Sequence, residues 1–258
     1  MANRRSVLRM CLGMCTCTVC ASFDFGFGGR PVRAGQQTDV RGRGYDLHFI
    51  GAQRDTVMNG KVAALLDLRP LAKTSHLYGI GPIEQLRGEV TIANSRPALA
   101  RVGPDGKVHV EDGFEAGVPF FVWAEVPAWQ IVTLPPHIQS HGDLEKFIPD
   151  AAALAGLDIQ KPLPFLLRGN TNFIEFHVLN RRGDQPHDAK MHKKIQTVFE
   201  LDGAKAVMVG FYSPNLRGVF TPMESTIHIH FQTSDNSVSG HVQKLSINEN
   251  VTLAFPSA

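Results

Sequence analysis

The stretch from Ser225 to Leu245, STIHIHFQTSDNSVSGHVQKL, constrains the fold more than any other part of this chain. Apolar side chains alternate with histidines in its first half, and successive side chains of a β-strand point to opposite faces. His228 and His230 therefore share one face of a predicted strand, and the other face is apolar. The polar run 233–239, TSDNSVS, is typical of a turn. The stretch predicts a β-hairpin.

A third histidine has the register to join the first two. A hairpin folded about Asp235 and Asn236 sets His241 opposite His230, where cross-strand Cβ atoms lie roughly 4.5–5.5 Å apart. Three neutral imidazoles on such a platform form a tripod for Zn²⁺ or a similar divalent ion and leave positions open for water or substrate. The alternative is that these histidines are ordinary polar residues of a strand and bind no metal. In addition, a change of one residue in the turn would point His241 to the wrong face. We predict that His228, His230 and His241 are metal ligands.

Composition favours strands and turns and argues against nucleic-acid partners. The 258 residues include 24 Gly and 16 Pro. The chain also contains many short β-prone runs. The length suits one large domain or two small ones. The formal net charge is +2, and the basic residues are scattered rather than gathered in the cluster that polynucleotide binding needs.

The first 34 residues have the pattern of an export signal. Three arginines at positions 4, 5 and 9 precede the apolar run 10–21, which is too short to span a bilayer as a stable anchor. Residues 3–9, NRRSVLR, resemble a bacterial twin-arginine signal. We predict an exported protein, periplasmic or extracellular, whose mature form has no stable membrane span.

All four cysteines, Cys11, Cys15, Cys17 and Cys20, lie in this leader. A mature chain without them has no disulfide, no thiol nucleophile and no cysteine-based zinc site. Removing residues 1–34 also removes five Arg and one Asp, which changes the formal net charge from +2 to −2. The mature domain is predicted to be close to neutral.

Local patterns divide the rest of the chain into three parts. Residues 35–56 are expected to form a flexible lead-in. Residues 57–160 are expected to form an N-terminal subdomain with a mixed sheet, and residues 161–258 a C-terminal subdomain whose antiparallel sheet carries the metal site. The predicted class is α+β, with few helices.

Two helices are predicted. Residues 57–72 have helical apolar spacing, which ends near Pro70. Ser140 and Asp143 are typical of a helix N-cap and first turn, and they predict a helix over 144–157 that separates the two subdomains.

Several motifs together resemble the α-acetolactate decarboxylase family. They are Gly210–Pro214 (GFYSP), His228–Phe231 (HIHF) and Ser239–Val242 (SGHV), preceded by Tyr78–Gly81 (YGIG) and Leu86–Glu89 (LRGE). Their order and spacing match that family, and the resemblance extends over roughly residues 60–247. It is strongest near the predicted hairpin.

The resemblance implies a reaction and a set of site residues. Members of the family convert 2-acetolactate, a small-molecule substrate, to acetoin and CO₂ through a zinc-stabilised enediolate, and they are usually homodimers. By resemblance His228, His230 and His241 are the Zn²⁺ ligands, and Glu89 is the active-site glutamate that orients substrate or relays a proton. His177 stands where the family has an arginine, and it replaces a permanent bidentate cation by one donor with a pH-dependent charge. Both Glu89 and His177 are therefore candidate catalytic residues.

Two other functions compete with this one. A cupin-like oxygenase using Fe or Mn also carries a His-x-His pair followed by a later histidine, but its acidic ligand is missing unless Asp235 serves. A non-catalytic relative that binds a metal or a small ligand is the second alternative, and His177 favours it.

Other candidate residues have weaker support. His137 and His141 have i, i+4 spacing, but Pro135 and Pro136 indicate that they lie in a loop. His187 and His192 fall in a charged connection and are expected to face solvent.

Two further pairs lie beside predicted strands. His76 and Tyr78 alternate together and are candidates to line the pocket, although structural roles are as well supported. Glu224 and Ser225 immediately precede the ligand strand and are candidates to orient the imidazoles.

Overall fold

The computed structural model describes residues 35–257, which belong to the compact unit Val32–Ala258. The predicted export signal, residues 1–34, lies outside the described residues. The helices of the described part are α1 (Gln53–Asn59), α2 (His141–Leu154) and α3 (Ala189–Lys194), with 3₁₀ helices at Arg69–Lys73 and Glu84–Leu86. Its strands are β1 (Thr38–Gly42), β2 (Tyr45–Ile50), β3 (Leu66–Asp67), β4 (Leu77–Pro82), β5 (Glu89–Ala93), β6 (Arg96–Val102), β7 (Val108–Glu111), β8 (Gly117–Val118), β9 (Phe121–Glu125), β10 (Trp129–Val132), β11 (Leu163–Asn170), β12 (Phe173–Leu179), β13 (Gln196–Asp202), β14 (Lys205–Tyr212), β15 (Ile227–Thr233), β16 (Ser239–Ser246) and β17 (Val251–Pro256).

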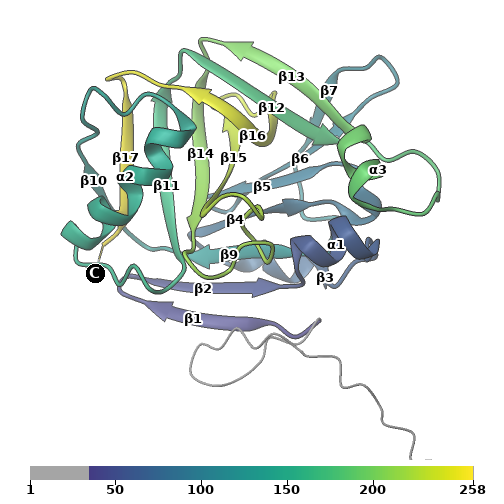
Figure 1. Cartoon of the computed structure of the whole chain (residues 1–258), viewed down its shortest axis with the longest axis horizontal. Coiled ribbons are helices and arrows are strands. Elements are labelled where there is room, and N and C mark those ends of the chain that lie inside the picture. Colours follow the sequence, from purple (N-terminus) through teal and green to yellow (C-terminus); the bar gives the residue numbers. More distant parts are fainter. Residues whose placement is uncertain (1–34, 258) are drawn as a thin grey trace, which may run out of the picture. The chain divides into compact units, whose positions relative to one another are not determined.

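Two large sheets make up most of the described chain (Figure 1). The first has seven strands in the order β1-β2-β9-β4-β5-β6-β7, and the second has eight in the order β10-β17-β11-β14-β15-β16-β12-β13. Strands β3 and β8 form a small separate pair. This β-rich architecture with few helices confirms the predicted α+β class.

The first sheet is antiparallel rather than mixed. Every pair of neighbouring strands in the described residues, in both large sheets, runs antiparallel. A parallel pair needs a crossover of a dozen or more residues, whereas β4, β5, β6 and β7 follow one another through short turns. The expectation of a mixed sheet was therefore wrong.

The segment 35–56 is ordered structure and not a flexible lead-in. Its strands β1 and β2 pair with each other, and β2 also pairs with β9. Tyr45, Leu47 and Phe49 alternate along β2 and are buried. The Tyr45 hydroxyl donates a hydrogen bond to the carbonyl of Pro162 at 2.8 Å. Residues 35–45 are rich in Gly, Gln and Arg, which favours a flexible segment, but the period-two pattern of YDLHFI forms a strand.

The helix expected over 57–72 is also different. Helix α1 starts earlier, at Gln53, and ends at Asn59 because Gly60 adopts a left-handed conformation with φ 64°. The rest of that stretch contributes β3 and a 3₁₀ helix with Pro70 in its first turn. The apolar residues of this stretch are therefore divided among three short elements instead of lying on one helix.

The start of α2 confirms the predicted cap. Ser140 accepts a hydrogen bond from the backbone of Asp143, whose carboxylate accepts one from the backbone of Ser140, so the capping box is complete. The helix does not divide the two sheets, however. The chain leaves the first sheet after Glu125 and enters the second at Trp129, so β10 and α2 both belong with the second sheet rather than with residues 57–125.

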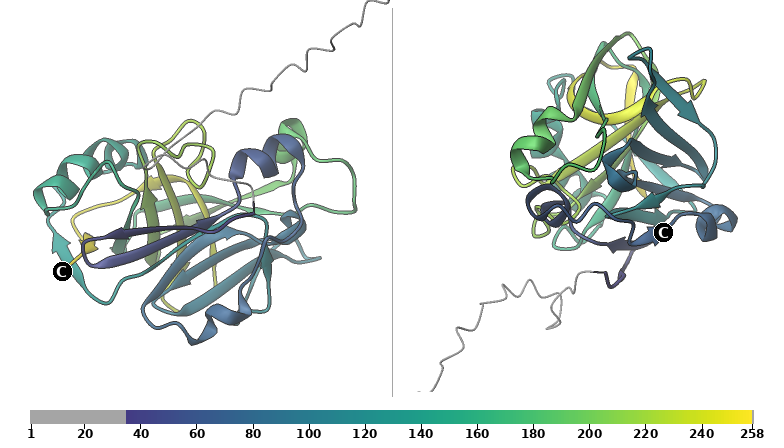
Figure 2. Two further views of the ribbon diagram at one scale, coloured as in Figure 1. Left: turned by 90° about the horizontal axis from the view of Figure 1, so that it is seen from below. Right: turned by 90° about the vertical axis from the view of Figure 1, so that its right-hand side faces the viewer.

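Strand β5 brings the two sheets together. It packs against β14, β15 and β16 of the eight-stranded sheet, and Figure 2 shows the two sheets from two further sides. The hydroxyl of Ser239 on β16 donates to the hydroxyl of Thr91 on β5 at 2.9 Å. The side chain of Asn236, at the tip of the hairpin, donates to the carbonyl of Pro97 at 3.4 Å. The hairpin is thus fixed against the first sheet.

Close packing behind the ligand strand can be tested at Gly210. This residue lies on β14 opposite Ile229, and an added Cβ would come within 2.1 Å of the buried Phe165 ring. We expect Gly210→Ala to destabilise the protein by about 1–3 kcal/mol through overpacking, measured as a lower midpoint of thermal unfolding. Gly142→Ala is the control, because the nearest atom to its new Cβ is 4.0 Å away. Equal midpoints for the two variants would contradict this account of the packing.

Candidate metal centre

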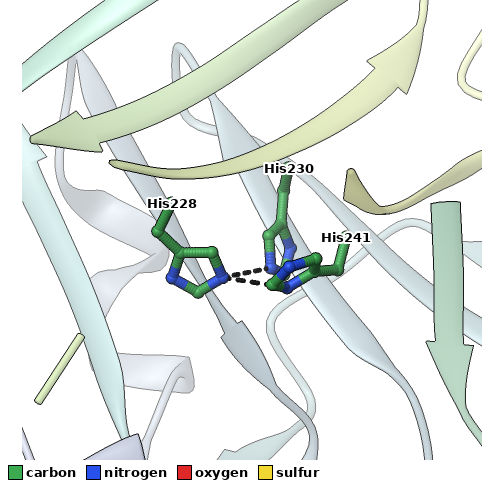
Figure 3. A group of neighbouring side chains, drawn as sticks. All are labelled: His228, His230 and His241. Carbon is green, nitrogen blue, oxygen red and sulfur yellow. Dashed lines mark hydrogen bonds between the residues drawn. The ribbon is translucent and has the colours of Figure 1, made fainter. Parts of the chain in front are cut away.

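Three imidazoles converge on one point of the hairpin formed by β15 and β16 (Figure 3). His230 is paired directly with His241, which confirms the predicted register. His228 Nε2 lies 3.0 Å from His241 Nδ1 and 3.1 Å from His230 Nε2. One ring nitrogen from each residue lies within 4.8 Å of the others. The turn length assumed from the sequence is the one observed.

Hydrogen bonding fixes which nitrogen of His228 carries the proton. Its Nδ1 lies 2.6 Å from the carbonyl oxygen of Phe220. A carbonyl can only accept, so Nδ1 must be the donor. The neutral ring then has its free electron pair on Nε2, the atom that faces His230 and His241. The backbone of Phe220 therefore orients this imidazole as a ligand.

Burial keeps the three rings neutral. His228 and His230 are only 2% and 0% exposed, and His241 is partly buried. Loss of hydration lowers the pKa of His228 to about 4 and holds the pKa values of His230 and His241 well below their usual range. Neutral imidazoles are the form that binds metal ions.

The donor set fits a divalent ion. In a tetrahedral zinc site with bonds of about 2.0–2.1 Å, ligand nitrogens are about 3.3 Å apart. The two separations given above, 3.0 and 3.1 Å, are within a few tenths of an ångström of that value. Three nitrogen ligands also leave a coordination position for another molecule.

Glu89 reaches the same point from the first sheet. It is the first residue of β5, and its carboxylate oxygens lie 3.9 Å from His230 Nε2 and 3.7 Å from His177 Nε2. Burial raises the pKa of Glu89 well above its usual value, and one backbone hydrogen bond from Leu179 lowers it only in part. A buried carboxyl of this kind retains a proton that it can donate.

His177 completes the group. It is paired with His241 across β12 and β16, and the two rings stack with centroids 4.5 Å apart. Burial, together with the nearby His192 and His228 rings, lowers the pKa of His177 to about 3. Its Nδ1 is buried and has no hydrogen-bond partner among the described residues. His177 thus places a neutral ring between Glu89 and His241.

A cavity of about 780 Å³ opens beside the imidazoles. All five residues proposed from the sequence line it, namely His228, His230, His241, Glu89 and His177. They come from four strands of two sheets, β15, β16, β12 and β5. The structure therefore brings together residues that are up to 152 positions apart in the sequence, from Glu89 to His241.

Two further histidines line the cavity although the sequence placed them elsewhere. His141 is the first residue of α2 rather than a loop residue, and His192 lies on α3. His187, expected to face solvent, is buried, and its Nε2 lies 3.2 Å from His192 Nδ1. No local pattern signals these positions, because contacts between distant elements create them.

The remaining candidates have other roles. His76 is exposed and Tyr78 packs edge-on against Trp129, so neither lines the cavity. Ser225 lines it, but its hydroxyl binds the carboxylate of Glu145 and a backbone carbonyl rather than an imidazole. The exposed Glu224 also lines the cavity.

Solved structures show the same fold at low sequence identity. An α-acetolactate decarboxylase from Bacillus subtilis strain 168 matches with a TM-score of 0.59 and 17% identity, covering 76% of this chain and 78% of that one. The enzyme from Bacillus subtilis subspecies spizizenii gives 0.60 and 17%, covering 76% and 80%. A Staphylococcus aureus protein of unknown function, described as similar to α-acetolactate decarboxylase, gives 0.60 and 14%, covering 77% and 82%.

Sequence comparison gives a complementary result. No curated protein matches this chain. The model of the family described as alpha-acetolactate decarboxylase, however, matches residues 53–257. That match includes both sheets apart from β1 and β2, together with Glu89, His177 and the three converging histidines. The chain therefore belongs to the alpha-acetolactate decarboxylase family.

Proposed function

We propose that this protein is a metal-dependent decarboxylase that converts 2-acetolactate, or a related 2-hydroxy-3-oxo acid, to acetoin and CO₂. Family membership and fold support a decarboxylase. The observation that carries the proposal is the convergence of three imidazoles and the buried carboxyl of Glu89 on a single cavity. This arrangement combines ligands for a cation with a proton donor.

The residues that would hold the ion are His228, His230 and His241, and zinc is the ion we expect. When bound, a divalent ion supplies the Lewis acidity that stabilises negative charge on the substrate's hydroxyl and keto oxygens. The surrounding protein excludes water from the two buried ligands, and this strengthens every electrostatic interaction at the site. The substrate's carboxylate would leave as CO₂ when its bond to the carbinol carbon breaks.

Glu89 is positioned to complete the reaction. The electron pair of the broken bond moves toward the adjacent carbonyl and gives an enediolate, which must take up one proton on carbon to become acetoin. Burial raises the pKa of Glu89 and so favours the protonated carboxyl, which lies beside His230. We assign Glu89 as the general acid.

His177 is assigned a different task from that of the family's arginine. Its neutral ring donates or accepts one hydrogen bond, whereas an arginine offers a bidentate fork to a carboxylate. With Nε2 at 3.7 Å from Glu89 and its ring stacked on His241, it orients both the acid and a metal ligand. A substrate carboxylate held weakly at this position is also free to leave as CO₂.

The alternatives fit the geometry less well. A cupin-like oxygenase would need Asp235 as an acidic ligand, but its carboxylate accepts hydrogen bonds from Thr233 and Ser237 within the turn. A non-catalytic relative does not account for a buried carboxyl beside the three histidines. The assays below separate binding alone from catalysis.

The first prediction concerns turnover. The metal-loaded chain should produce acetoin from racemic 2-acetolactate well above the rate of spontaneous decarboxylation. His230→Ala should fall to that background, because it removes a ligand that is 0% exposed. Acetoin can be measured colorimetrically. Background rates for the wild type, despite bound metal, would overturn the proposed reaction.

The second prediction concerns metal content. We expect one divalent ion per chain by elemental analysis, and little or none in His241→Ala. His109→Ala is the matched control, since His109 lies on β7 with a side chain 59% exposed. Zinc should also raise the unfolding midpoint of the wild type and the control but not of His241→Ala, because a ligand that binds only the folded state stabilises it. Equal metal content in all three proteins would disprove the ligand assignment.

The third prediction separates acid catalysis from metal binding. Glu89→Gln keeps the side chain's shape but removes the transferable proton, so kcat should fall by about 10²–10⁴-fold. Metal content should remain unchanged, because Glu89 is not one of the converging ligands. Glu111→Gln, an exposed carboxylate on β7, is the control. Full activity in Glu89→Gln would exclude the carboxyl as the acid.

Export and dimerisation remain predictions of the sequence. No helix among the described residues is long and apolar enough to cross a membrane. We propose that the chain is exported through its twin-arginine-like leader and acts as a homodimer. Fractionation of cells and the molar mass of the purified protein in solution would check these two proposals.

A further inference from the structure

We propose that the site takes 2-hydroxy-3-oxo acids whose alkyl substituent on the carbinol carbon is longer than ethyl, and that Met58 and Met223 bind that chain. This inference rests on the proposed function and specifies the substrate class of the same site. Three features of the cavity support it: its size, the position of its apolar wall, and the two methionines at its rim.

The cavity is large for 2-acetolactate. Its volume of about 780 Å³ is in the range of pockets that hold drug-sized ligands. The substrate's hydroxyl, keto and carboxyl groups would occupy only the end where His228, His230, His241 and Glu89 meet. Much of the space is then left for a substituent.

The remaining wall is largely apolar and comes from four separate elements. It contains Val57 and Met58 of α1, Phe120 before β9, Leu179 of β12, and Met223 in the loop before β15. Val57, Phe120 and Leu179 are buried, so they form a preformed surface rather than a flexible one. Polar side chains such as Gln53 and Lys193 also line the cavity.

Met58 and Met223 are the two methionines of the cavity lining. Each is 50% exposed although it borders the cavity. Their two segments are joined at the backbone, because the amides of Gln53 and Arg54 donate to the carbonyls of Val219 and Gly218 at 2.7 and 2.8 Å. Two flexible thioether side chains on neighbouring segments adapt to alkyl chains of different length.

The rim is formed by short elements. Helices α1 and α3 pack against each other, and the views in Figures 1 and 2 agree in showing them side by side. The polar ligands lie instead on long paired strands. The ligand end of the cavity is thus rigid, and the methionines lie at the end where a chain of variable length would emerge.

The test uses a series of 2-alkyl-2-hydroxy-3-oxobutanoates with methyl, ethyl, propyl and butyl substituents. In the wild type, kcat/KM should rise about fourfold for each added methylene that is buried, from about 0.8 kcal/mol per CH₂. In Met58→Ser and Met223→Ser the increase per methylene should be reduced, most of all beyond ethyl. Leu154→Ser, which changes a 91% exposed apolar residue of α2 outside the cavity, should keep the wild-type increase.

A binding series on the full chain separates this inference from the proposed reaction. The ligands are 2-alkyl-2-hydroxy acids that lack the keto group and cannot be decarboxylated by this route, and their dissociation constants are measured by calorimetry. Affinity that rises with chain length, and rises less in the two methionine variants, supports the inference even if no acetoin is formed. Affinity and kcat/KM that are flat or fall beyond ethyl overturn it, even if acetoin is formed from 2-acetolactate.

Discussion

The site depends on the burial of one face of β15 against the first sheet. Both faces of this strand are covered, so the imidazoles of His228 and His230 lie in the interior rather than at the surface. Desolvation makes their charged forms costly and keeps the rings neutral. An interior position also obliges each ring to find partners, and the carbonyl of Phe220 fixes the tautomer of one of them. The neutral state and the orientation of these imidazoles therefore follow from packing as well as from residue type.

The packing between the sheets also places one carboxyl, that of Glu89, beside His177 and His230. Glu89 begins β5, the strand that crosses the hairpin, and it has few hydrogen bonds to offset its burial. Its high pKa and its proximity to His230 are consequences of the same contact. The hydrogen bond between Ser239 and Thr91 fixes this contact at the start of β16. A shift of β5 against the hairpin would change the acid and the ligands together.

The sequence was informative where the signal is local. Period-two alternation and the turn about Asp235 and Asn236 were sufficient to predict the pairing of His230 with His241, because register in a hairpin is set by a few neighbouring residues. Glu89 and His177 were identified only through resemblance to the family. His141 and His192 were missed, since they reach the cavity from α2 and α3 through contacts that no nearby residue signals. Strands β1 and β2 were missed because composition was given more weight than alternation.

The cavity combines rigid strands, which carry the histidines, with short elements at its rim. This division affects how the site can change between related proteins. Substitutions at Met58 in α1 or Lys193 in α3 change the wall of the cavity at residues that do not lie on a strand carrying one of the histidines. His177 is the exception, because it is on β12, stacks on His241 and approaches Glu89. An arginine there would place a permanent charge next to a metal ligand and would favour the ionised form of the acid. Under the proposed function, a neutral ring at this position gives charge a smaller part in holding the substrate than an arginine would.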